Sequence, residues 1–224
     1  MPTPPKLLND DGTASISTLF MMSHHAFRRD LTRFGTALET FATTAPRVEA
    51  LKAEWTNFHA ALHGHHTMED TAIFPSIAAQ DQAVAPIIDG LSADHRKIDP
   101  ILEQGDRAFA ELPGAVEAAT RVIRELTTLL GPHLATEEEK LIPFLRGAKA
   151  FPTPSSDAEA DLYAGGFAWT MHGIAPEVLD KVYPMLPEIL STKLPAARAA
   201  FEERCERVWG TTKPTASTTP IPGV

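Results

Sequence analysis

Apolar residues recur along most of this chain at spacings of three and four positions, which is the period of one face of an α-helix. No segment alternates apolar and polar residues convincingly over the length of a strand. The pattern predicts four long helices in succession, over about residues 15–42, 46–79, 85–112 and 113–148. Short connections between long amphipathic helices favour antiparallel packing. We therefore predict an all-α fold built on an antiparallel up-down four-helix bundle.

Two of these predicted helices contain residues that interrupt helices. Pro100 lies inside the third, and the pair Gly131-Pro132 lies inside the fourth. Proline removes one backbone donor and clashes with the carbonyl group four residues earlier. We expect a kink at each place.

The rest of the chain predicts a smaller helical region and two unstructured ends. Shorter helical pieces are expected over about 157–171, 176–186 and 196–209, after a linker rich in Pro and Ser and between further prolines. The ends are rich in Pro and Thr and have little to bury. The expected organisation is a disordered N-terminus (1–14), the bundle (15–148), a short C-terminal helical appendage (157–209) and a disordered tail (210–224).

Composition narrows the class of protein. The chain has 224 residues, of which 43% are hydrophobic, and a formal net charge of −9. This acidic balance argues against nucleic acid and anionic membranes as partners, since both favour a basic face. There is no apolar run long enough to span a membrane and no signal-peptide pattern, so we expect a soluble, cytoplasmic protein. The single cysteine excludes an intrachain disulfide and a cysteine-built metal site.

The histidines, nine in all, follow an internal repeat. In the second predicted helix His65 precedes Glu69 by four positions, and in the fourth His133 precedes Glu137 by four, 68 positions later. Residues four apart lie on the same face of a helix. Apolar residues share both faces, so each pair of imidazole and carboxylate is expected to point into the bundle.

The first and third predicted helices repeat as well. His24 corresponds to His95, 71 positions later, and both lie among apolar residues on their helix face. Four imidazoles and two carboxylates are thus expected to converge on one interior, where unpaired carboxylates are costly and repel each other. A pair of metal ions resolves this, and the donors suit iron, manganese or zinc. A lone histidine on an apolar face is more often a hydrogen-bonded core residue, but the duplication favours metal binding.

These motifs resemble the hemerythrin-like (HHE cation-binding) family. The residues that carry the resemblance are His24, His65-His66-x-x-Glu69-Asp70-x-x-Ile73-Phe74-Pro75, His95, and His133-x-x-x-Glu137-Glu138-x-x-Leu141-Ile142-Pro143. The resemblance covers about residues 15–148 and implies a four-helix bundle with a non-haem di-iron centre. It implies two iron ions with an oxo or hydroxo bridge, in preference to manganese or zinc. By position, His24, His65, His95 and His133 would be terminal ligands, and Glu69 and Glu137 would bridge the ions.

The chain departs from the oxygen-carrying members of that family. Those have a second histidine four positions after the one on the third helix, where this chain has Asp99. Their second carboxylate usually follows its histidine by five positions, whereas Glu137 follows by four and Glu138 by five. Two imidazoles per ion would leave more open coordination positions, which favours reaction over reversible oxygen transport. The iron–sulfur repair branch is disfavoured because its cysteine-bearing N-terminal segment has no counterpart here.

Other histidines have weaker claims to a functional role. His59, His63, His66 and Asp70 form a second stripe on the second predicted helix, for which we favour a solvent-facing role or a role in orienting ligands. Asp70 or Glu138 could orient a ligand imidazole. His25 is expected to be exposed or capping. His172, outside the bundle, is expected to pack, with a place above the metal pocket as the alternative.

Three functions are compatible with these residues. The first is a non-haem di-iron protein that binds and reacts with small oxidants (peroxide, nitric oxide or oxygen), as in oxidative or nitrosative stress. The alternative is an oxygen, redox or iron sensing or binding module without turnover, which the appended C-terminal helices favour. The third is a structural or metal-sequestering bundle. The expected partner is a small diatomic or peroxide ligand; the sequence leaves open whether the protein is an enzyme and whether it forms a homo-oligomer.

Overall fold

The described part of the chain is helical, as the apolar spacing predicts. This computed structural model describes residues 6–40, 45–147 and 151–211, and over these ranges it contains helices and turns but no strand. The prediction of an all-α fold is confirmed. The chain divides into two compact units, one formed by residues 30–141 and the other by residues 1–29 together with 142–224.

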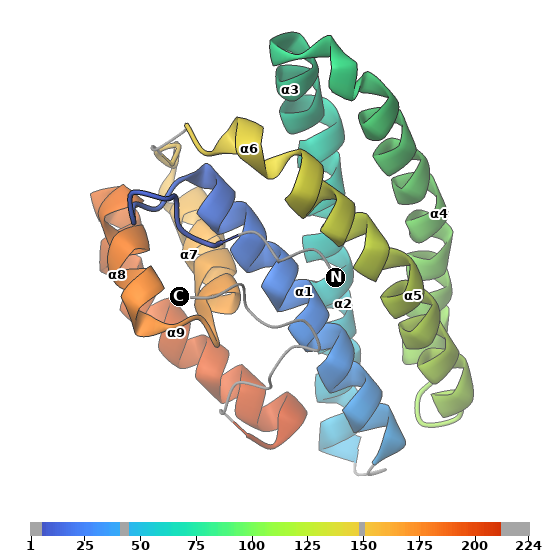
Figure 1. Cartoon of the computed structure of the whole chain (residues 1–224). Coiled ribbons are helices and arrows are strands. Elements are labelled where there is room, and N and C mark those ends of the chain that lie inside the picture. Colours follow the sequence, from blue (N-terminus) through green and yellow to red (C-terminus); the bar gives the residue numbers. More distant parts are fainter. Residues whose placement is uncertain (1–5, 41–44, 148–150, 212–224) are drawn as a thin grey trace. The chain divides into compact units, whose positions relative to one another are not determined.

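The unit of residues 30–141 contains most of the predicted bundle. It holds the end of α1 (Ile16–Glu39), then α2 (Ala45–Met68), the π-helical turn η1 (Glu69–Ile73), α3 (Phe74–Gln80), the 3-10 turn η2 (Gln82–Val84), α4 (Ala85–Ala110) and α5 (Val116–Lys140). In Figure 1, α4 and α5 lie side by side and antiparallel, because the turn at residues 111–115 reverses the chain. The predicted second helix, 46–79, is interrupted by the π-helical turn.

Aromatic side chains pack α1, α2 and α4 together within this unit. The rings of Trp55 and Phe109 are stacked with centroids 4.5 Å apart and an interplanar angle of 8°. Phe34 of α1 meets Trp55, Phe58 and Phe109 edge-on at 5.4 to 5.9 Å. All four rings are buried, and such aromatic pairs stabilise a core beyond the area they bury. These rings therefore pack the three helices together at the middle of α2 and the end of α4.

Gly105 of α4 is the position at which this aromatic packing requires a glycine. A Cβ atom added there would lie 1.9 Å from Cζ2 of Trp55, far inside contact distance. We expect Gly105→Ala to lower the free energy of unfolding by about 1–3 kcal/mol, the usual cost of overpacking a core. Urea unfolding followed by circular dichroism measures this change.

Gly90→Ala is the matched control, because Gly90 lies in the same helix and a Cβ there meets nothing within 4 Å. Alanine is a better helix former than glycine, so this variant should gain up to about 1 kcal/mol. Equal stability changes at the two positions would show that the indole ring does not restrict the backbone of α4.

Both interior prolines are accommodated within continuous helices. Pro100 lies inside α4 and Pro132 inside α5. The residues whose carbonyl groups lose a partner, Arg96 and Thr128, are exposed, so water can bond these carbonyl groups. The kinks expected at these prolines stay predictions.

The second unit contains the C-terminal helices. It holds residues 16–29 of α1, then α6 (Ile142–Leu145), α7 (Asp157–Met171), α8 (Pro176–Val182), the 3-10 turn η3 (Tyr183–Met185) and α9 (Glu188–Trp209). α7 begins where predicted because Ser156 caps it, accepting a hydrogen bond from the Glu159 amide. The Glu159 carboxylate accepts in return from the Ser155 amide. The first bond satisfies a donor that the first turn of a helix leaves open, and the second ties the residue before the cap to the same turn. α7 and α9 then pack side by side (Figure 1).

Two segments of this unit differ from the sequence-based expectation. Residues 6–14, expected to be unstructured, form a turn in which Asn9 and Thr13 hydrogen-bond and the side chain of Leu7 is buried. The segment was expected to be unstructured because most of its residues are polar, but the apolar side chain of Leu7 anchors it. α9 continues through Pro195 instead of beginning after it, because the residue four positions earlier, Ser191, is exposed and its carbonyl group can bond water.

The expected domain boundaries stay predictions, and residues 1–5 and 212–224 of the expected disordered ends lie outside the described residues. Among the described helices, none is long and apolar enough to cross a membrane.

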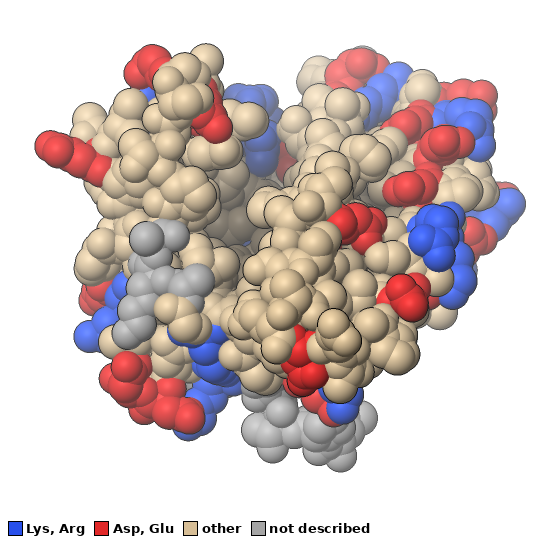
Figure 2. All heavy atoms as spheres, turned by 90° about the horizontal axis from the view of Figure 1, so that it is seen from above, with Lys and Arg blue, Asp and Glu red and all other residues tan. Residues whose placement is uncertain are grey.

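Figure 2 shows one face of the molecule, on which acidic and basic side chains of the described residues are interspersed among uncharged ones.

Candidate metal centre

Five of the six predicted ligand residues lie in the unit of residues 30–141. His65 is near the end of α2, Glu69 opens the π-helical turn, His95 lies in the middle of α4, and His133 and Glu137 lie in α5. Every one of these side chains is buried. Three chain segments that are distant in sequence thus supply imidazole and carboxylate groups to one interior.

The π-helical turn has a cause in the sequence. Pro75, at the start of α3, cannot donate to the carbonyl group of Thr71, and its ring would clash with that group in a regular α-helix. The wider turn over Glu69–Ile73 relieves this clash, and such π segments often occur at functional sites. The repeat places Pro143 six residues after Glu137, just as Pro75 follows Glu69 by six. In this second half, α5 ends at Lys140, before the proline. Both carboxylates therefore lie just before a helix interruption.

Glu69 faces two imidazoles with its two oxygen atoms. Its Oε1 lies 2.9 Å from Nε2 of His65, and its Oε2 lies 3.4 Å from Nε2 of His95. The side chain is fully buried. A carboxylate with a different imidazole at each oxygen could hold a metal cation together with either ring.

His95 and His133 face each other across α4 and α5. Their Nε2 atoms are 3.2 Å apart, and Nε2 of His133 is 3.3 Å from Oε1 of Glu137. Two adjacent nitrogens bound to one ion at 2.0–2.1 Å lie about 2.8–3.4 Å apart, from octahedral to tetrahedral geometry. The observed separation fits two nitrogens that share an ion.

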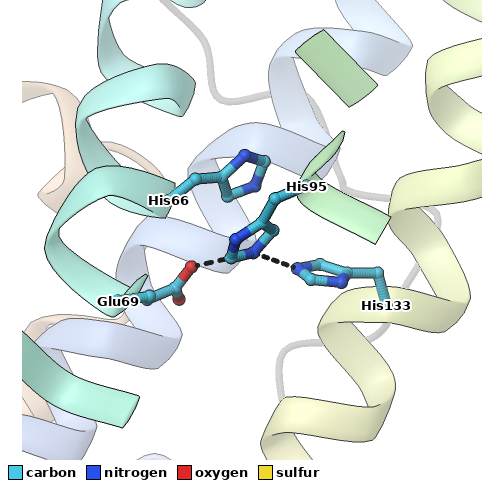
Figure 3. A group of neighbouring side chains, drawn as sticks. All are labelled: His66, Glu69, His95 and His133. Atoms are coloured by element: carbon cyan, nitrogen blue, oxygen red, sulfur yellow. Dashed lines mark hydrogen bonds and ion pairs between the residues drawn. The ribbon is translucent and has the colours of Figure 1, made fainter. Parts of the chain in front are cut away.

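His66 belongs to the same group, although it was not among the predicted ligands. Its ring stacks on that of His95 with centroids 4.0 Å apart, as Figure 3 shows. One donor atom each from His66, Glu69, His95 and His133 lie within 4.8 Å of one another. The solvent-facing alternative considered for His66 is wrong, since the side chain is 3% exposed.

The sequence contained a signal for His66. It precedes Glu69 by three positions, and residues three apart share a helix face just as residues four apart do. The absence of a histidine at the matching position of the fourth helix, Leu134, hid this signal.

Burial and charge set the protonation of these imidazoles. Burial, followed by the positive charge of His95 and His65, lowers the pKa of His66 to about 2. Burial also acts to lower the pKa of His65, but the charge and hydrogen bond of Glu69 outweigh it and raise that pKa overall. The pKa of His95 is raised in the same way by Glu69 and Asp70, against the effect of burial. The neutral ring of His66 keeps its lone pair for a ligand.

Asp70 orients His95 from the side away from the cluster. Its Oδ2 is 2.8 Å from Nδ1 of His95, and its other oxygen accepts a hydrogen bond from the hydroxyl of Ser92. The geometry agrees with the orienting role expected for Asp70. A carboxylate at Nδ1 fixes the ring so that the lone pair of Nε2 points at a metal position.

Asp70→Ala should therefore weaken metal binding about 10–100-fold while leaving the fold intact, as for other residues that orient a ligand. The measurement is a titration with Fe²⁺ under anaerobic conditions. Asp99→Ala is the control, because the Asp99 side chain is half exposed and its carboxylate lies 3.8 Å from Nδ1 of the exposed His63. Equal losses in both variants would mean that Asp70 has no specific role.

The remaining predicted residues have different positions. His24 lies in α1 within the other unit, where it is buried beside Phe20 with ring centroids 4.4 Å apart; its role as a ligand stays a prediction. His25 is buried, so the exposed position expected for it is wrong. The reason is that α1 buries more than one face, as the adjacent buried residues on both sides show.

His59, His63 and His172 lie outside the cluster and have contacts of their own. His63 is exposed, and Nδ1 of His59 lies 2.8 Å from Oδ1 of Asp106. His172 packs edge-on against Phe201 at 5.2 Å, as expected of a packing residue. These contacts need no metal ion.

The cluster in residues 30–141 fits a metal cation. Both ring nitrogens of His66 are buried and have no hydrogen-bond partner among the described residues. Leaving such groups unpaired costs about 1–3 kcal/mol each, and burying carboxylates costs more. Imidazole nitrogens combined with carboxylate oxygens suit iron, manganese and zinc. The fold and these donors define a helical-bundle protein with buried His/Glu groups that could hold a metal cation.

Comparison with known protein families gives the same class. The family model for the Hemerythrin HHE cation binding domain matches residues 15–145. The chain therefore belongs to the hemerythrin HHE family, and the resemblance inferred from its motifs is confirmed. Neither a comparison with curated proteins nor one with solved structures gave a match.

Proposed function

We propose that this chain binds two iron ions and reacts with a small oxidant such as peroxide, nitric oxide or oxygen. The observation that carries the proposal is Glu69, fully buried with its two oxygens directed at imidazoles of two helices. The proposed ligands are His65, Glu69, His95, His133 and Glu137, with His24 added from the sequence repeat. When bound, two iron ions would supply paired redox centres with positions open to a small molecule.

The residues of the chain have separate tasks in this proposal. Glu69 and Glu137 hold negative charge in the interior and balance the charge of the cations. His95 presents Nε2 because Asp70 holds its Nδ1. Apolar neighbours of the cluster, such as Phe74, whose ring stacks on His95 with centroids 5.7 Å apart, exclude water from this side of the ring. We also propose that the protein is located in the cytoplasm.

The test of this function is consumption of peroxide and of nitric oxide by iron-loaded protein. We expect consumption that depends on iron and that stops in Glu137→Ala, whereas His172→Ala should keep both iron and activity. If oxygen changes the absorption spectrum reversibly and peroxide is left untouched, the catalytic proposal fails and the binding or sensing proposal replaces it.

One observation favours the sensing alternative. Arg29, fully buried in α1, donates hydrogen bonds to the carbonyl oxygens of Trp169 and His172 at the end of α7, at 2.9 and 2.8 Å. His24 lies five residues earlier in the same helix. If His24 binds a metal ion, occupancy would act on the helix that holds the last carbonyl groups of α7.

Hydrogen exchange tests this alternative. A sensor should show slower amide exchange in α7 and α9 when iron is bound, with the difference lost in Arg29→Ala. Identical exchange with and without iron would leave α7 and α9 without a signalling role.

A further inference from the structure

The structure supplies one more imidazole than the sequence repeat does. We infer that His66 is a metal ligand and that it replaces, from α2, the second histidine that α4 lacks at Asp99. This inference rests on the proposed binding of two metal ions. It makes the two metal positions unequal.

The position of His66 relative to the other donors is the first argument. One donor atom of His66 lies within 4.8 Å of donor atoms of Glu69, His95 and His133, and its ring centroid is 5.6 Å from that of His133. Figure 3 shows the three rings and Glu69 arriving from α2, η1, α4 and α5 and converging on one space. All four residues lie in the unit of residues 30–141.

The missing partners of His66 are the second argument. A histidine that only fills a core normally bonds a backbone or side-chain group through at least one nitrogen. Among the described residues, neither nitrogen of His66 has such a partner. His95 shows the contrast, since Asp70 occupies its Nδ1 and leaves Nε2 directed at the cluster. A metal ion would satisfy a nitrogen of His66 that is otherwise buried at a cost.

Asp99 itself cannot serve as the replacement ligand. Its side chain is half exposed, and its carboxylate lies 3.8 Å from Nδ1 of the exposed His63. The loss of an imidazole on α4 is therefore compensated by an imidazole on α2.

The resulting ligand set is uneven. His66, His95 and His133 would surround one ion, whereas His65, with His24 from the repeat, would serve the other, and Glu69 lies between them. An incoming small molecule then has its open position at the ion of His65. Reaction with an oxidant requires only this one position.

The experiment is an anaerobic Fe²⁺ titration of the wild type, His66→Leu and the control His63→Leu. Wild type and His63→Leu should bind two ions. In His66→Leu one of the two binding steps should weaken by about 100-fold or more, at or beyond the upper end of the effect of an orienting residue. The metal-free His66→Leu protein should melt no lower than the wild type, since an unpaired buried imidazole has been replaced by an apolar group.

His66→Gly with added imidazole separates ligation from packing. Added imidazole should restore binding of the second ion in this variant. If His66 only filled space in the core, added imidazole would not restore that ion. If wild type and His66→Leu bind two ions with the same affinity and the same ferric absorption, the inference is wrong and the proposed di-iron function stands. If the wild type binds no iron, both are wrong.

Discussion

Glu69→Gln is expected to retain neither iron ion after anaerobic loading and desalting. The two oxygens of Glu69 face imidazoles of both α2 and α4, at 2.9 and 3.4 Å. The amide keeps the shape of the side chain but removes the negative charge and one acceptor. Iron analysis and the visible absorption of the oxidised protein measure the loss.

Glu139→Gln is the matched control, because Glu139 lies on the exposed side of α5, where it pairs with Lys140. This variant should hold as much iron as the wild type. Circular dichroism should show the same helix content in both variants. A Glu69→Gln protein that keeps two ions would exclude Glu69 as the bridge between them.

Removal of iron should lower the melting temperature strongly. Binding to the folded state alone adds about 3–4 kcal/mol when free metal exceeds the dissociation constant by 100–1,000-fold. For a chain of this length, that energy corresponds to a shift of about 6–16 °C. The metal-free cluster contributes to the difference, because the buried carboxylates of Glu69 and Glu137 then have no metal charge to balance their own. Calorimetry of metal-free and iron-loaded protein measures the shift.

The comparison needs a variant in which the metal effect is absent. Glu69→Gln should melt at one temperature whether or not iron is added. Equal melting temperatures for metal-free and iron-loaded wild type would show that the ions do not bind preferentially to the folded cluster.

The sequence repeat predicts most of the cluster because it depends on local geometry. His65 with Glu69 and His133 with Glu137 share helix faces by their spacing alone, and the structure brings them together with His95. The proline that follows each carboxylate is part of the sequence motif. The sequence did not predict its effect, which is a π-helical turn in one half and a helix end in the other.

Features that depend on neighbouring elements could not be predicted. A helical wheel gives the direction of His25 and His66 but not what lies against them, and both proved buried. The sequence does not show that position 105 requires glycine. The requirement arises only because the indole of Trp55 packs against α4 and leaves no space for a Cβ atom. The passage of α9 through Pro195 depends on whether Ser191 is exposed.

His66 changes the chemical argument drawn from Asp99. The missing histidine on the third bundle helix suggested two equally open ions, whereas a fifth imidazole from α2 would close one position. The expected reactivity then depends on the ion near His65. Variants of His65 and His66 should accordingly differ. His65→Ala should weaken the ion that has the open position, and with it the binding of small molecules, whereas His66→Leu should weaken the other ion.

We propose that a buried cluster of histidines and glutamates in this chain holds two metal ions. The most direct test is the iron content of wild-type protein that has been loaded anaerobically with Fe²⁺ and desalted, measured by mass spectrometry against the protein concentration. We predict two irons per chain, and ferric absorption after oxidation. A ratio near zero would show that the cluster does not hold iron.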